Sequence, residues 1–111
     1  MKSAIILDSV AQAFGVSVRE IMGKTRERPV ARARQAAYYL CREFTSLSYP
    51  RIGAKFNRDH STVMYGVKQV GHLRFRNPEF DRKIVSAEAR ITRRLMERRP
   101  VDDVRRLQAP L

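Results

Sequence analysis

Four consecutive polar side chains in the middle of the chain are hydrogen-bonding groups of the kind that reads DNA: Asp59, His60, Ser61 and Thr62. The Thr62 methyl group suits contact with the thymine C5 methyl, and the Asp59 carboxylate can accept from cytosine N4. Capping is the alternative, since Asp, Ser and Thr at a helix start routinely bond its free N–H groups. The basic residues around this run favour DNA as the ligand: Lys55, Arg58 and Lys68.

The elements that position this run have the spacing of a helix-turn-helix. Ser48 is placed to cap a short helix that has Pro50 in its first turn and ends near Phe56. Residues 57–59 are predicted to form a break between two helices. The last of them, Asp59, is placed to cap the second helix. In a helix-turn-helix the second helix enters the major groove with its N-terminal residues at the base edges.

Periodic apolar residues predict further helices and no strand. A first helix ends at Gly15, and Ser17 with Glu20 predicts a capping box that opens a short turn. A long helix is expected from about Val30 to Thr45, and a last one from Asn77-Pro78 to about Arg98. The fold class is therefore predicted to be all-α.

The net charge of +12 points to a polyanionic partner. Residues 24–60 alone carry nine basic and three acidic groups, so a basic tail does not explain it. The single cysteine, Cys41, excludes an internal disulfide framework and fits a reducing cytoplasm. No apolar run approaches the roughly 20 residues of a membrane-spanning helix.

Metal binding and catalysis find little support in the sequence. His60, His72 and Cys41 lack the close spacings of a metal site, and the acidic residues are scattered with no nucleophile–base pair among them. We therefore expect no enzyme activity, no metal and no cofactor.

Two motifs in the chain are similar to those of a known family. One is Ile52-Gly53-x-x-Phe56-x-Arg58-Asp59-His60-Ser61-Thr62-Val63, and the other is Val30-Ala31-Arg32-x-Arg34-Gln35. Together they resemble the C-terminal DNA-binding domain of the DnaA family of bacterial replication initiators. The resemblance covers about residues 4–73.

The resemblance implies a fold and a set of DNA contacts. The fold is a helical bundle of the Trp-repressor-like type with a helix-turn-helix, here residues 1–76. The chain beyond it matches nothing in the family pattern, and its own apolar spacing predicts an additional C-terminal helix (77–99) followed by a flexible tail (100–111). The loop residue Arg26, with Arg28 close by, corresponds to the family's minor-groove arginine, and residues 59–62 correspond to its major-groove run. The implied phosphate contacts are Arg32, Arg34, Arg42, Tyr49, Pro50, Arg58 and Lys68.

The chain also departs from the family pattern. Asn57 alone stands where the family has two glycines, and Ala33 replaces a proline. No Gly-x-x-x-x-Gly-Lys-Ser/Thr loop occurs, so we expect a stand-alone, nucleoid-associated cytoplasmic protein that binds DnaA-box-like duplex sites without an ATPase domain.

Several alternatives stay open at this point. The last helix either folds back onto the domain or pairs with a second copy, as its near-heptad apolar spacing allows. The chain either binds specific duplex DNA to regulate replication initiation or transcription, or uses the last helix to bind a replication or transcription protein. Non-specific DNA compaction driven by charge is a third hypothesis.

Overall fold

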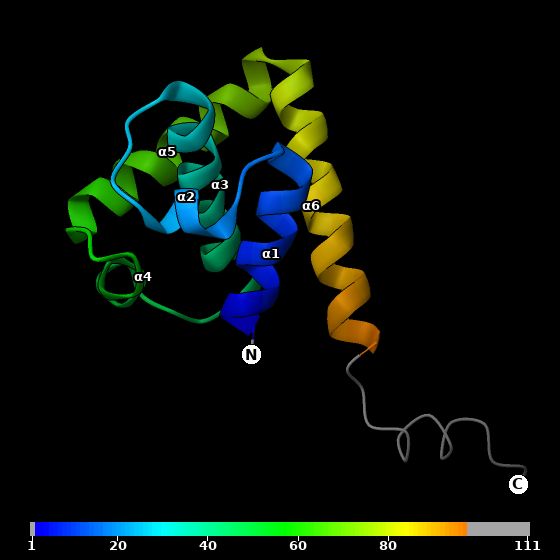
Figure 1. Cartoon of the computed structure of the whole chain (residues 1–111), viewed down its shortest axis with the longest axis horizontal. Helices are drawn as coiled ribbons and strands as arrows, with labels where there is room; N and C mark the ends of the chain where they lie inside the picture. The colour runs from blue at the N-terminus through cyan, green and yellow to red at the C-terminus, as the bar shows by residue number, and fades with distance from the viewer. Residues whose placement is uncertain (1, 98–111) are drawn as a thin grey trace, which may run out of the picture.

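The computed structural model describes residues 2–97, which form helices and no strand. The six helices are α1 (Lys2–Phe14), α2 (Val18–Met22), α3 (Arg28–Phe44), α4 (Tyr49–Phe56), α5 (His60–Arg76) and α6 (Pro78–Glu97). The predicted all-α fold is confirmed, and Figure 1 shows α3 inside the bundle with α1 and α6 side by side. The tail expected at 100–111 lies outside the described residues.

Local sequence signals account for most helix boundaries. Gly15 follows α1 with a φ of 70°, in the left-handed region that glycine adopts without strain. The predicted capping box of α2 is present, because the Ser17 hydroxyl accepts from the Glu20 N–H at 3.0 Å and the Glu20 carboxylate accepts from the Ser17 N–H at 2.9 Å. The third helix begins at Arg28 rather than near Val30, because Pro29 belongs to its first turn, where a missing N–H costs nothing.

The core forms around α3, whose inward face is buried along its whole length. Tyr38 packs edge-on against Phe56 of α4, with ring centroids 5.0 Å apart. Gly66 of α5 faces the same tyrosine, and a Cβ on Gly66 would lie 2.8 Å from Tyr38 Cδ2. A glycine at position 66 therefore lets α5 approach α3 closely enough to share the core.

The last helix folds back onto the domain, which resolves the alternative left open by its apolar stripe. Phe80, Ile84, Ala87 and Ile91 are all buried in the same cluster as the apolar residues of α1 and α3. Phe80 also meets Phe14 of α1 edge-on at 5.6 Å. The boundary expected at residue 76 therefore lies between two segments that share one core. The apolar stripe of α6 is buried in that core, so it is not available for an interface with a second copy.

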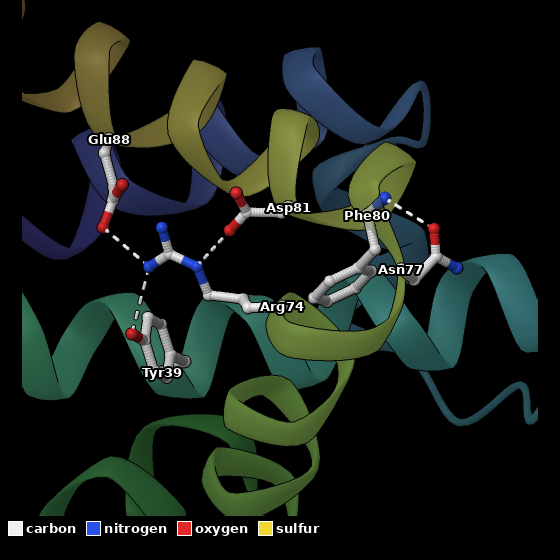
Figure 2. A network of polar contacts seen from close by, with 6 residues as sticks. All are labelled: Tyr39, Arg74, Asn77, Phe80, Asp81 and Glu88. Atoms are coloured by element: carbon white, nitrogen blue, oxygen red, sulfur yellow. Dashed lines mark hydrogen bonds and ion pairs between the residues drawn. The ribbon is translucent and has the colours of Figure 1, made fainter.

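A polar junction fixes α6 against α3 and α5 (Figure 2). Arg74 of α5 donates to Asp81 at 2.5 Å, to Glu88 at 3.3 Å and to the Tyr39 hydroxyl at 3.1 Å. The Asn77 side chain accepts from the Phe80 N–H at 3.1 Å and caps α6. Burial alone would lower the pKa of Arg74, but the bonds to Asp81 and Tyr39 and the charge of Glu88 raise it, so this guanidinium stays charged.

Within residues 2–97, none of the helices has the length and apolar character needed to cross a membrane.

Candidate nucleic-acid interface

The turn between α4 and α5 is short, and the backbone conformation of Asn57 makes it possible. Asn57 adopts the left-handed conformation (φ 54°, ψ 49°), which asparagine tolerates better than most residues other than glycine. The Arg58 N–H then donates to the Gly53 carbonyl at 2.8 Å. A Cβ on Gly53 would lie 2.4 Å from the Arg58 carbonyl oxygen, so this position accepts only glycine.

Asp59 is the N-cap of α5, so the capping interpretation of this residue is confirmed. Its carboxylate accepts from the Ser61 N–H at 3.2 Å and also from the Ser61 hydroxyl. The bonds from Ser61 lower the pKa of Asp59, which keeps the carboxylate ionised. The Asp59 side chain is nevertheless 66% exposed, and its acceptor oxygens remain at the surface.

The rest of the predicted major-groove run also lies at the exposed start of α5. His60 is 55% exposed, with its Nδ1 3.6 Å from a carboxylate oxygen of Asp59. Ser61 and Thr62 are exposed as well. Helix N-termini carry partial positive charge and free N–H groups, so this end of α5 attracts an anion.

A cleft of about 550 Å³ separates the start of α5 from the loop between α2 and α3. Arg26 and Lys24 line it from the loop, and Thr62 lines it from α5. The structure thus brings the predicted minor-groove arginine and the predicted major-groove helix to two sides of one basic cleft.

Arg34 lies beneath this cleft and is only 7% exposed. Its guanidinium donates to the carbonyl oxygens of Ile21 at 2.7 Å, Thr25 at 3.0 Å and Glu20 at 3.1 Å. Burial, together with the nearby charge of Arg58, lowers its pKa. This placement favours a positioning role for Arg34 over the phosphate contact that the resemblance implied, because its donors already hold the loop.

Arg58 also connects the turn between α4 and α5 to the loop between α2 and α3. Its guanidinium donates to the carbonyl oxygens of Gly23 at 2.8 Å and Phe56 at 3.0 Å. It is half-buried and also lines the cleft. Arg58 therefore couples the turn of the helix-turn-helix to the loop that carries Arg26.

The other predicted contacts divide between two places on the surface. Arg28 and Arg32 line a second hollow next to Phe14 and Asn77, and Arg32 also donates at 3.0 Å to the side-chain oxygen of Gln35, which lines the cleft. Arg42 lies over the Tyr49 ring, with 4.3 Å from its guanidinium carbon to the ring centroid. It also donates to the Leu47 carbonyl at 3.0 Å, so the corner between α3 and α4 is fixed. Two more predicted contacts are exposed: Pro50 in the first turn of α4 and Lys68 on α5.

The cleft also contains residues outside the predicted DNA contacts, among them Lys24, Gln35 and Tyr65. Tyr65 is 59% exposed, whereas the contacts that the resemblance implies include Tyr49 and no other tyrosine. The sequence contained a signal for Tyr65, because it lies four residues after Ser61 on the same helix and therefore shares a face with it.

Cys41 is buried, and burial raises the pKa of its thiol to about 11. It therefore stays protonated and packs as an apolar residue. In the described part of the chain, the His, Cys, Asp and Glu side chains form no group of three that could hold a metal ion.

Comparison with known proteins places this architecture in a family. The family described as bacterial DnaA protein helix-turn-helix matches residues 3–70. The chain is 44% identical over 95 residues to the chromosomal replication initiator protein DnaA of Mycobacteroides abscessus, covering 85% of this chain and 19% of that protein. It is 46% identical over 76 residues to the proteins of the same name from Neisseria meningitidis and Neisseria gonorrhoeae, covering 68% of this chain and 15% of each relative.

The chain thus spans less than a fifth of the length of these relatives. The match includes the loop that carries Arg26, all of α4, and α5 as far as Val70. The chain therefore belongs to the bacterial DnaA helix-turn-helix family of DNA-binding domains.

Proposed function

We propose that the chain binds specific duplex DNA at DnaA-box-like sites, and that at the nucleoid it regulates initiation of replication or transcription. The observation that carries this proposal is the cleft shared by Arg26 and Thr62. A helix in the major groove and an arginine in the adjacent minor groove must be held at a fixed separation, and Arg34 and Arg58 supply that rigidity.

Binding of this kind needs no nucleotide. The 111 residues contain no glycine-rich phosphate loop, so we propose that they occupy their sites without ATP hydrolysis. The affinity for the site should then be the same with and without added ATP and Mg²⁺.

Selection of bound duplexes from a random pool tests the specificity directly, and an enriched box is the expected result. His60→Ala should weaken binding to that box and flatten the base preference, because it removes a base-edge contact but no phosphate contact. Arg26→Ala should weaken binding as well. Arg82→Ala, an exposed arginine on α6, is the matched control and should leave binding unchanged.

Enrichment of no sequence would contradict the proposal and favour compaction driven by charge. Competition with random duplex at about 0.2 M salt separates the two, because non-specific binding weakens steeply with salt.

A second candidate function is binding of a replication or transcription protein or of a second copy, for which we propose the outward face of α6. Val85 and Met96 are 49% and 59% exposed there, while the other face packs against α1. Val85→Asp with Met96→Asp should abolish partner binding under this hypothesis and leave DNA binding intact.

A further inference from the structure

A hollow between α1 and α6 gathers arginines that the helix-turn-helix does not use. Three of them line it, one turn or less apart on α6: Arg90, Arg93 and Arg94. Figure 1 shows α6 on the side of the molecule opposite α4 and the start of α5. The hollow measures about 180 Å³, below the roughly 300–1,000 Å³ of pockets for drug-sized ligands, so it suits one small group.

The charge balance of the hollow is positive. Among the described residues, Glu97 is the only acidic one in the wall of the hollow. Asp8 lies beside the wall and accepts from Arg94 at 2.5 Å. Arg90 donates to the neutral Gln12 amide oxygen at 2.6 Å. The Arg93 side chain makes no ion pair or hydrogen bond with another residue of 2–97. Three guanidinium groups thus face two carboxylates, and planar guanidinium forks match the oxygens of a phosphate.

Ser9 gives an independent indication of a ligand. It lines the same hollow from α1 and is 1% exposed, yet its hydroxyl has no hydrogen-bond partner among the described residues. An unpaired buried hydroxyl is costly, and alanine would fill this helical position without that cost. The hydroxyl oxygen is enclosed as the side chains stand, so an acceptor oxygen of a bound anion would satisfy it once the exposed arginine side chains of the hollow shift to admit the anion.

We propose that this hollow, the α1–α6 arginine pocket, binds a phosphate group through Arg90, Arg93 and the Ser9 hydroxyl. Two sources present the same chemistry. One is a small phosphorylated molecule, and the other is the backbone of a DNA segment separate from the one on the helix-turn-helix.

The first test is a ¹H–¹⁵N NMR titration of the full chain with inorganic phosphate at constant ionic strength. We expect saturable shifts of α1 and α6 amides around Ser9 and Arg93. Arg93→Gln should weaken phosphate binding by about tenfold, the loss of one charge-assisted hydrogen bond. Arg82→Gln removes an exposed charge outside the pocket on the same helix and should change nothing.

The proposal is overturned if sodium chloride produces the same shifts, or if the Arg82 and Arg93 variants bind phosphate equally well. Either result would mean general screening of a basic surface.

Ser9→Ala provides a second test with two opposite readouts. It should raise the melting temperature, because it removes an unpaired buried hydroxyl, and it should lower phosphate affinity. If Ser9 had only a structural role, its replacement would change the melting temperature and leave the phosphate affinity unchanged. Unchanged phosphate affinity in both Ser9→Ala and Arg93→Gln would contradict phosphate binding in this pocket.

A short random duplex identifies the source of the phosphate. If the duplex shifts the pocket resonances in the unmodified chain and not in Arg93→Gln, the ligand is a second DNA segment. If inorganic phosphate shifts them and the duplex does not, the ligand is a small phosphorylated molecule. These resonances are distinct from those of α5, so failure here leaves the helix-turn-helix proposal standing.

Discussion

Arg58 donates to the carbonyl oxygen of Gly23 at 2.8 Å, a bond that joins residues 35 positions apart in the sequence. Gly23 begins the loop that carries Arg26, and Arg58 belongs to the turn that sets the direction of α5. The two parts of the domain that we propose to face DNA are therefore held together by a direct contact and not only by the common core.

Arg34→Lys should lower the free energy of unfolding by about 2 kcal/mol, because a lysine cannot serve three separate carbonyl oxygens from one buried position. Urea denaturation measures the loss. Arg28→Lys, at an exposed position of the same helix, should stay within about 0.5 kcal/mol of the unmodified chain. Equal losses in both variants would refute the positioning role of Arg34.

Gly53→Ala should cost about 1–3 kcal/mol, since its Cβ would overlap the Arg58 carbonyl and force the turn to open. Duplex binding should fall with it. Gly71→Ala is the matched control: nothing lies within 4 Å of a Cβ there, and an alanine inside α5 should stabilise the chain by about 0.5–1 kcal/mol. Thermal unfolding of the two variants should therefore shift in opposite directions.

Tyr65→Phe should weaken binding to the selected duplex by roughly fivefold, the value of about 1 kcal/mol for one neutral hydrogen bond. The hydroxyl of this exposed tyrosine is the part lost, and the ring is kept. Fluorescence anisotropy measures the affinity. An unchanged affinity would show that the DNA backbone does not reach this side of the cleft.

Lys68→Gln should weaken binding to all duplexes equally and reduce the slope of log K against log salt concentration by about 1, as expected for one lost phosphate contact. The sequence preference should persist, in contrast to His60→Ala. Arg82→Gln should leave the slope unchanged, which separates a phosphate contact from a general effect of net charge.

The free energy of unfolding should fall as the pH rises from about 4.5 to about 7, because Glu43 of α3 lies beside Glu88 of α6. Burial, and then the hydrogen bond and charge of Glu88, raise the pKa of Glu43 from 4.5 to about 7, against the opposing charge of Arg74. The folded state therefore binds a proton that the unfolded state releases. This contribution is fully present below pH 4.5 and is lost as the pH rises through about 7.

Glu43→Gln tests this assignment. The variant should lose the part of the pH dependence that lies between about 4.5 and 7 and should be more stable than the unmodified chain at pH 8. Melting temperatures across this range measure it. The same slope in both proteins would show that another group titrates.

The sequence alone predicted the helices and their caps, because the signals involved are local. The cap at Asp59, the capping box at Ser17 and the apolar spacing in α6 each depend on residues within one or two turns, and the structure confirms them. The exposed run at the start of α5 follows from the same local rules.

Only the tertiary structure decided how individual arginines are used. Arg32, Arg34 and Arg58 cannot be told apart by residue type. Arg34 is nevertheless buried on three carbonyl oxygens, Arg58 bridges the loop and the turn, and Arg32 donates to the Gln35 side chain. Which guanidinium finds carbonyl partners depends on segments up to 35 residues away, so no local pattern contains that information. The same holds for the apolar stripe of α6, whose spacing suits either α1 or a second copy until the packing is known.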